Sequence, residues 1–211
     1  MAKMCLYGEP GWGSVIVEAQ LDWYAFDYDF DRVGDLFKSA ASRDRLAAVN
    51  PLAQIPTLVL ADGTVLTESA AITLYLAEVT GKDTLVPRTG NAQRGAFLRW
   101  LVYLVANVYP TYTYGDDPSR FVDGDEARRS FKAHVDDYAK KLYTMLEGVV
   151  GAPWFLGERF SALDLYVCAM TRWRPKRPWF AANTPKLAAI AVRTEQVPAL
   201  AACWQRNQLP G

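Results

Sequence analysis

Residues 50–78 read NPLAQIPTLVLADGTVLTESAAITLYLAE, and they carry the clearest structural signals of the first part of the chain. An apolar run predicts a strand over residues 57–60. Asp62 and Gly63 then form the pair that is typical of a tight hairpin turn, so a second strand is expected over 64–66. The segment therefore contains a strand, a turn and a returning strand.

A capped helix follows this hairpin directly. Glu68 and Ser69 stand where a helix over residues 69–80 begins, and Gly81 is placed to end it. Pro56 stands directly before the strand over 57–60. Because proline has no N–H, it leaves the backbone at that edge of the strand without a hydrogen-bonded neighbour. A helix start rich in N–H donors, next to an opened strand edge, can hold an extended peptide by its backbone and its charged ends.

Strands and helices alternate before this segment. Apolar periodicity predicts a strand, a helix, an alternating half-buried strand and a polar helix, in that order, over 4–7, 14–24, 26–31 and 40–49. With the hairpin and its helix, the order is β-α-β-α-β-β-α. This order predicts a small mixed sheet flanked by helices.

The rest of the chain has a helical pattern throughout. Helices are expected over 91–109, 125–150 and 161–172, and two shorter ones after Pro185 and Pro198. The sequence therefore predicts an α/β domain over residues 1–82 and an all-helical domain over 90–211.

The helix at 161–172 carries a strong start signal. Ser161 and Asp164 have the spacing of a capping box, and Phe160 can pack on Leu165 as a hydrophobic staple. A cap of this kind contributes about 1 kcal/mol. We assign this pair to folding and keep Asp164 out of the active site.

Composition excludes several classes of function. The 211 residues include 23 basic and 23 acidic side chains, and this balance gives no case for a nucleic-acid or anionic-membrane surface. No apolar run approaches the roughly 18 residues of a membrane span, and no signal-peptide core is recognised. We therefore expect a soluble cytoplasmic protein.

Metal and disulfide chemistry are not expected. Cys5, Cys168 and Cys203 are odd in number, far apart and set in apolar runs, so they are interpreted as buried, inert thiols. The single histidine, His134, falls among charged residues and is interpreted as a solvated helix residue.

Three stretches, residues 50–58, 62–76 and 154–166, together resemble the cytosolic glutathione transferase family, and the resemblance extends over essentially the whole chain. It is greatest to bacterial, serine-type members. The resemblance implies a thioredoxin-like first domain and a helical second domain, which agrees with the predicted order of elements. It also implies glutathione as co-substrate, an electrophilic small molecule as partner, a role in detoxification, and a homodimer.

The family resemblance assigns glutathione contacts to particular positions. Ile55 would bond the cysteinyl backbone through its own main chain, and Pro56 would be cis. Glu68 would face the γ-glutamyl ammonium, while Ser69 and the helix start would face its carboxylate. Gln54 and Lys38 are weaker candidates for binding the remaining polar ends of glutathione.

The chemistry needs a thiolate. A thiol with a pKa near 8.5 is only about 3% ionised at pH 7. Lowering that pKa by two units requires about 2.7 kcal/mol. A hydrogen bond to a charged group supplies about 1.5–3 kcal/mol, and a helix N-terminus adds about 0.3–1. One well-placed hydroxyl at the start of the first helix is therefore sufficient.

Two hydroxyls compete for this role. Ser14 opens the first helix, where serine-using family members place theirs, and no acid three residues later explains it as a capping box. Tyr7 ends the first strand, as in tyrosine-using members. We favour Ser14, and Tyr7 is kept as the alternative.

Other positions depart from the family pattern or extend it. Gly13 stands where bacterial beta-type members carry a cysteine, which disfavours thiol–disulfide chemistry, and Glu18 stands where many relatives have a basic residue. The acceptor pocket is assigned to four aromatic residues, Trp12, Tyr7, Tyr109 and Tyr112. The main hypothesis is conjugation of glutathione to an electrophile. A maleylacetoacetate-type isomerase and a non-catalytic interaction module are the alternatives.

Overall fold

The computed structural model describes residues 3–208, and the chain divides into two compact units. One unit contains the residues up to Val86 together with those from Glu195 onward, and the other is Pro87–Thr194. The segment from Glu195 onward therefore groups with the first unit, whereas the sequence pattern alone places it with the helical domain.

The first unit is built on a four-stranded sheet. Its strands are β1 (Met4–Gly8), β2 (Tyr28–Arg32), β3 (Thr57–Val59) and β4 (Val65–Leu66). The strand order is β2-β1-β3-β4. β2 runs parallel to β1, while β3 is antiparallel to both β1 and β4. The predicted small mixed sheet is confirmed.

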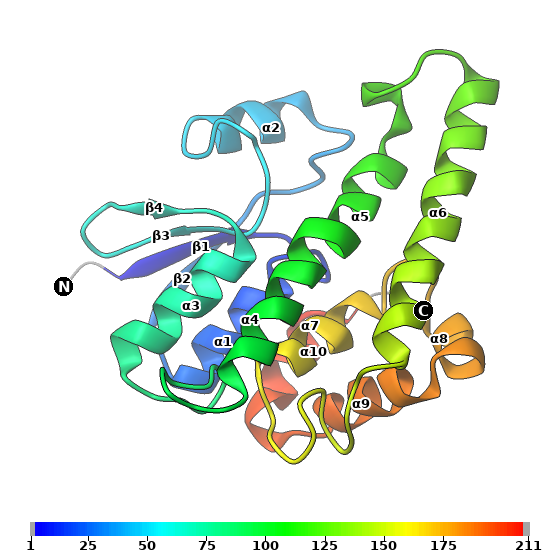
Figure 1. Cartoon of the computed structure of the whole chain (residues 1–211). Coiled ribbons are helices and arrows are strands. Elements are labelled where there is room, and N and C mark those ends of the chain that lie inside the picture. The colour runs from blue at the N-terminus through cyan, green and yellow to red at the C-terminus, as the bar shows by residue number, and fades with distance from the viewer. Residues whose placement is uncertain (1–2, 209–211) are drawn as a thin grey trace. The chain divides into compact units, whose positions relative to one another are not determined.

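Helices cover both faces of this sheet. α1 (Val15–Tyr24) and α3 (Ser69–Thr80) lie on one face and α2 (Ala40–Ala47) on the other, as Figure 1 shows. The core between the sheet and the first pair is fully buried at Leu6, Leu58, Ile16 and Ile72. The unit is completed by two short elements that pack on α1, η3 (Pro198–Leu200) and α10 (Ala201–Arg206).

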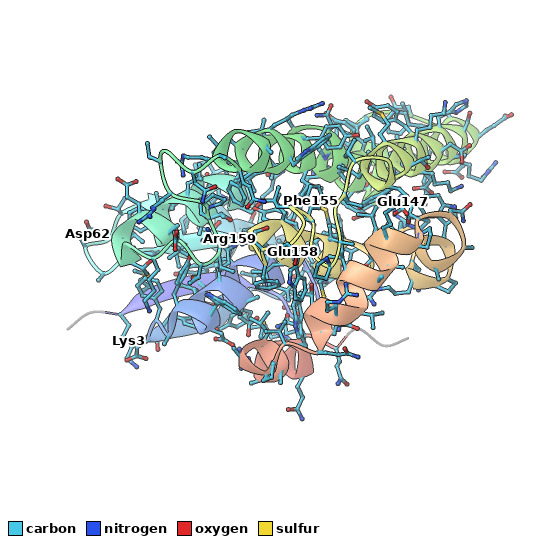
Figure 2. The ribbon with its side chains drawn as sticks, turned by 60° about the horizontal axis from the view of Figure 1, so that its bottom comes forward. Lys3, Asp62, Glu147, Phe155, Glu158 and Arg159 are labelled. Atoms are coloured by element: carbon cyan, nitrogen blue, oxygen red, sulfur yellow. The ribbon has the colours of Figure 1, made fainter. Side chains whose placement is uncertain are left out.

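The hairpin turn forms as its residues predict. The Thr64 N–H donates to Asp62 Oδ1 at 2.9 Å, and Gly63 has a φ of +87° that favours glycine. Figure 2 labels Asp62 at this turn, on the surface of the molecule. This turn leads into β4 and then into the start of α3.

The second unit is helical throughout the region described. Its elements are α4 (Arg94–Tyr103), η1 (Leu104–Val108), α5 (Tyr109–Asp116), η2 (Pro118–Arg120), α6 (Asp125–Glu147), α7 (Ala162–Met170), α8 (Arg177–Asn183) and α9 (Pro185–Glu195). All nine residues of α7 are buried, so this helix forms the centre of the unit. α8 was not predicted from the sequence, although Pro178 lies in its first turn, where a helix tolerates proline.

The helix predicted to end at residue 109 continues to Asp116. Pro110 lacks an N–H and would clash with the carbonyl four residues earlier in a regular helix. The chain widens instead into a π-helical turn, η1, in which the Tyr109 N–H bonds the Leu104 carbonyl. The helix passes the proline because of this wider turn.

The predicted capping box at the start of α7 is present. Asp164 Oδ2 accepts from the Ser161 N–H at 2.8 Å and from its hydroxyl at 3.1 Å. Asp164 Oδ1 accepts from the Phe155 N–H at 2.7 Å, and Phe155 is labelled in Figure 2. Burial raises the pKa of Asp164 to about 7, although these hydrogen bonds act in the opposite direction.

The thiols and the histidine lie in different environments. Cys168 and Cys203 are buried, but Cys5 is only half-buried, because strand alternation puts it on the face of β1 opposite Leu6. His134 is exposed on α6, with Nδ1 2.8 Å from the Ser130 carbonyl. Within residues 3–208, no group of three His, Cys, Asp or Glu is arranged to hold a metal ion. None of the helices described combines the length and apolarity that crossing a membrane requires.

Candidate functional site

The loop between β1 and α1 starts with a tight turn. The Trp12 N–H donates to the Glu9 carbonyl at 3.0 Å, which closes a four-residue turn. Pro10 occupies its second position, and Gly11, with a φ of +77°, occupies its third. A proline followed by a residue of positive φ is the signature of a type II turn. The sequence of this loop therefore fixes its backbone just before α1.

Ser14 follows this turn and is fully buried. Its hydroxyl accepts from the Glu9 N–H at 3.1 Å and donates to the Glu9 carbonyl at 3.2 Å. A Cβ on Gly8 would lie 2.5 Å from this hydroxyl, so the loop needs a glycine there. The main-chain N–H groups of Gly13 and Ser14, in contrast, make no hydrogen bond to any described residue. The start of α1 thus carries a hydroxyl engaged within the loop and two open amides.

The cis-proline segment lies in the same unit. The Ile55–Pro56 peptide is cis, as expected. The main chain of Ile55 makes no hydrogen bond within the part of the chain described, so its N–H and carbonyl are available to a ligand. Gln54 is exposed, and its carbonyl accepts from Asn50 Nδ2 at 3.0 Å and from Thr57 Oγ1 at 2.8 Å. These two hydrogen bonds fix the backbone just before Ile55.

The start of α3 presents the second group of open donors. Glu68 is exposed and has a φ of +62° and a ψ of 105°, a conformation that costs a non-glycine residue about 1–3 kcal/mol. Ser69 is buried, yet its hydroxyl bonds no described residue and makes no cap. The first N–H groups of any helix also lack intrahelical partners. A strained acid, an unpaired hydroxyl and open amides therefore meet at one helix start.

An apolar cluster brings three candidate residues together. Tyr7, Trp12 and Ile55 all pack against a core made of Val33, Leu36 and Leu46. The Trp12 ring also lies 5.1 Å from that of Phe37, between ring centroids. Burial raises the pKa of Tyr7, which makes this phenol a poorer hydrogen-bond donor to a thiolate. Trp12 and Ile55 thus link the α1 loop to the cis-proline segment.

The two tyrosines predicted for the acceptor pocket belong to the second unit and differ in their contacts. The Tyr112 hydroxyl pairs with that of Tyr143 and donates to the Arg174 carbonyl at 3.2 Å. The Tyr109 hydroxyl is buried and has no hydrogen-bond partner among the described residues. Burial raises the pKa of both phenols. Tyr112 is therefore committed to internal bonds, and Tyr109 is not.

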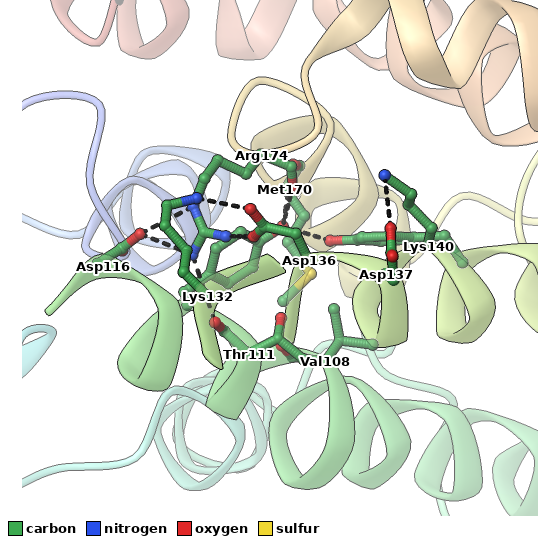
Figure 3. Close-up of polar contacts among 11 residues, drawn as sticks. Val108, Thr111, Asp116, Lys132, Asp136, Asp137, Lys140, Met170 and Arg174 are labelled. Atoms are coloured by element: carbon green, nitrogen blue, oxygen red, sulfur yellow. Dashed lines mark hydrogen bonds and ion pairs between the residues drawn. The ribbon is translucent and has the colours of Figure 1, made fainter. Parts of the chain in front are cut away.

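Figure 3 shows the polar cluster around Arg174 in this unit. Its guanidinium binds Asp116 at 2.8 and 3.0 Å, pairs with Asp136, and donates to the Thr111 carbonyl at 3.3 Å. A Cβ on Gly115 would lie 2.5 Å from Arg174 Nη2, so a larger residue there would displace the guanidinium. A cavity of about 210 Å³ beside the cluster is lined by Thr111, Tyr112, Asp136, Ala139, Lys140, Arg174 and Pro175.

One residue at the first site was missed in the sequence. Asn207, just after α10, accepts a hydrogen bond from the Gly11 N–H at 2.9 Å. The two residues are 196 positions apart, and no local pattern indicates such a contact. The partner of the Ser14 hydroxyl, the backbone of Glu9, was also missed, because it lies before Ser14 and a capping pattern indicates only residues that follow the cap.

Known proteins share both the sequence and the fold. Residues 18–79, which contain the cis-proline segment and the start of α3, match the family model described as the glutathione S-transferase N-terminal domain. The chain is 40% identical to the "Uncharacterized GST-like protein YncG" of Escherichia coli K12, over 97% of this chain and 98% of that protein. It is 29% identical to the glutathione S-transferase GstA of E. coli O157:H7, over 81% of this chain and 82% of that one.

A solved structure agrees with these relatives. The crystal structure of a glutathione transferase homologue from Sulfitobacter, with bound glutathione, superposes with a TM-score of 0.87. It is 26% identical and covers 99% of this chain and 100% of that one. The expected combination of a thioredoxin-like domain and a helical domain is confirmed. Sequence and structure lead to the same conclusion, that the chain belongs to the glutathione S-transferase family.

Proposed function

We propose that the protein is a glutathione transferase that joins the sulfur of glutathione to an electrophilic small molecule. The start of α3 is the observation that supports this most directly. Ser69 there keeps a hydroxyl without a partner in the region described, and Glu68 keeps a strained backbone. This hydroxyl and the first N–H groups of α3 can therefore bind a ligand without breaking a hydrogen bond of the fold.

The glutathione peptide would bind along the edge next to the cis-proline. Its cysteinyl backbone would exchange hydrogen bonds with the open main chain of Ile55, as in strand addition. The γ-glutamyl carboxylate would lie against the Ser69 hydroxyl and the amides of α3, and its ammonium against Glu68. Gln54, which is exposed beside Ile55, would reach a remaining polar end.

The sulfur would then lie at the start of α1. Ser14 stays our candidate for the side chain that stabilises the thiolate. Its bond to the Glu9 carbonyl is 3.2 Å long, whereas hydroxyl bonds cluster near 2.7–2.8 Å. An anionic sulfur is a stronger acceptor than a carbonyl, so it could draw the hydroxyl away. The open amides of Gly13 and Ser14 would add to the stabilisation through the helix dipole.

The reaction itself needs no further group from the protein. With a chloronitroaromatic acceptor, the thiol proton passes to solvent and the thiolate attacks the carbon that bears chlorine. A carbon–sulfur bond forms, the carbon–chlorine bond breaks, and chloride leaves with the electron pair. Trp12, which belongs to the same unit as Ser14, is proposed to line the acceptor side of the site.

Calorimetry with glutathione, followed by activity with 1-chloro-2,4-dinitrobenzene, tests the proposal. We expect saturable heat with glutathione and turnover that Ser14→Ala lowers at least tenfold while Tyr7→Phe keeps it. If only Tyr7→Phe loses turnover, the Tyr7 phenol stabilises the thiolate. If both variants keep turnover, the main-chain amides of Gly13 and Ser14 stabilise it. The absence of heat at millimolar glutathione would refute the enzyme and favour an interaction module.

We further propose a cytoplasmic homodimer. α6 exposes Tyr138 and Met145 on one helical face, at 51% and 60%, and α4 exposes Val102 at 56%. Exposed apolar side chains of this size are typical of protein contacts when they gather on one surface. Sedimentation should give twice the chain mass, and Met145→Lys should shift it toward the monomer. Three cysteines at distant positions fit a reducing compartment.

A further inference from the structure

Asn207 lies between the α1 loop and helix α1 itself. Its side chain is 1% exposed and uses both of its polar atoms. Oδ1 accepts from the Gly11 N–H at 2.9 Å, while Nδ2 donates to Glu18 Oε2 at 2.7 Å and to the Cys203 carbonyl at 3.0 Å. One amide therefore joins three parts of the first unit.

Glu18 determines which way this amide faces. The carboxylate can only accept, so it binds the NH₂ group and leaves the oxygen for Gly11. Glu18 is buried, at 4% exposed, and α10 also holds it through Arg206, whose Nε lies 2.7 Å from Oε1. Arg206 reaches Asp22 as well, at 2.6 Å, but has no bond to the loop. Asn207 is thus the residue of this network that contacts the turn.

The contact acts on the peptide that defines the turn. Type I and type II turns differ mainly by a flip of their central peptide, here the one between Pro10 and Gly11. An acceptor fixed on the Gly11 N–H holds that peptide in the type II orientation. Trp12 and the open amides of Gly13 and Ser14 follow within three residues, so a flip would redirect them.

We propose that Asn207 is a positioning residue that holds the Pro10–Gly11 turn, and through it the amides and hydroxyl at the start of α1, in the orientation that stabilises the glutathione thiolate. This inference rests on the proposed function. It assigns the segment after α9 a part in the chemistry, although Asn207 has no contact with the sulfur in this account.

The test compares Asn207→Ala with Arg206→Gln. Both remove hydrogen bonds between α10 and Glu18, so both should lower the unfolding temperature, but only the first removes the bond to Gly11. In Asn207→Ala, we expect the bound thiol to titrate about one pH unit higher by thiolate absorbance. With a thiol pKa that moves from about 6.5 to about 7.5, the thiolate fraction at pH 6.5 falls from about one half to about one tenth, so activity there should fall about fivefold. Arg206→Gln should titrate like the wild type.

A double variant distinguishes a loss of positioning from simple misfolding. E18Q/N207D exchanges the amide and the carboxylate, so the carboxylate accepts from Gly11 and from the new amide, and the number of acids is unchanged. The bond to the Cys203 carbonyl is lost, because a carboxylate has no N–H to donate. We expect it to restore the wild-type titration and the slow hydrogen exchange of the Gly11 amide. Equal titration shifts in Asn207→Ala and Arg206→Gln, or none in either, would overturn the positioning role while glutathione binding persists. Failure of the wild type to bind glutathione would refute the proposed function and this inference together.

Discussion

Two helix starts in this protein treat their polar groups in opposite ways. At α7, the carboxylate of Asp164 accepts three hydrogen bonds, from the Ser161 N–H, the Ser161 hydroxyl and the Phe155 N–H, and is fully buried. At α3, Ser69 makes no cap, and the carboxylate of Glu68 is exposed above a backbone of positive φ. We call the α7 start closed, because the chain itself satisfies its polar groups, and the α3 start open, because its polar groups are left for water or a ligand.

The difference separates folding from binding. A helix N-terminus has four N–H groups without intrahelical partners, and these must be satisfied by the protein, by water or by a ligand. α7 lies in the centre of its unit, away from water, so its own side chains must do this. α3 begins shortly after β4, whose Leu66 pairs with Leu58 of β3, so its start follows the end of the hairpin at which the Ile55 main chain is open, and we propose that a peptide does it there. Four predictions test this contrast.

The largest effect is expected at the closed start. Asp164→Ala leaves the Phe155 and Ser161 N–H groups buried without an acceptor, at about 1–3 kcal/mol each. We therefore expect the free energy of unfolding to fall by about 3 kcal/mol, measured by urea denaturation. Ser69→Ala is the matched control, and it should change stability by less than about 1 kcal/mol. Equal losses at the two starts would contradict the contrast.

The closed start should also respond to pH. The pKa of Asp164 is about 7 in the folded protein and about 3.8 when unfolded, so folding favours the protonated acid. Its contribution to stability is fully present below about pH 4 and is lost as the pH rises through 7. The stability of the wild type relative to Asp164→Asn should therefore decrease between pH 4 and 7. A difference that grows over this window would mean that the three donors outweigh burial.

At the open start, binding should suffer more than folding. In the proposed binding mode, Ser69→Ala removes a hydrogen bond to the glutathione carboxylate, and bonds to charged groups are worth about 1.5–3 kcal/mol. We expect the dissociation constant measured by calorimetry to rise about 10- to 100-fold. Ser161→Ala, the matched control at the closed start, should lower stability and leave the dissociation constant of the folded protein near that of the wild type.

The smallest effect should have the opposite sign for stability. Glu68→Gly relieves the positive φ at residue 68, and because glycine also gains freedom in the unfolded chain, the net gain should be about 1 kcal/mol. The same change removes the carboxylate that is proposed to face the glutathione ammonium, so binding should weaken. Differential scanning calorimetry with and without glutathione would show both. A variant that loses stability and keeps its affinity would show that the backbone strain serves no ligand.

Local chemistry explains what the sequence could predict. The hairpin at Asp62-Gly63, the end of α3 at Gly81 and the capping box at Ser161 all depend on residues within four positions of each other. The two domains followed from the order of predicted strands and helices, with which the family resemblance agreed, and the cis peptide at Pro56 came from the resemblance alone. Each of these was confirmed.

The features that the sequence did not predict depend on contacts between distant residues or on unusual backbone geometry. The helix continues through Pro110 because a π turn absorbs the clash, and no periodicity indicates such a turn. β2 begins at Tyr28 rather than residue 26, because the alternating pattern continues beyond the residues that pair with β1. The hydroxyl of Ser14 turns back to Glu9, and Asn207 reaches Gly11 across 196 positions. The roles of Ser14, Tyr7, Tyr109 and Tyr112 in catalysis stay predictions.

The contact between Gly11 and Asn207 also has a consequence for biosynthesis. The ribosome synthesises β1 long before α10. The thioredoxin-like unit therefore cannot be completed until the whole helical unit has been translated. The helical unit is continuous in sequence and can fold first, since domains generally fold as units. During that interval Glu18 lacks Arg206 and Asn207. A nascent chain stalled before Glu195 should therefore hold an unfinished first unit that chaperones can recognise.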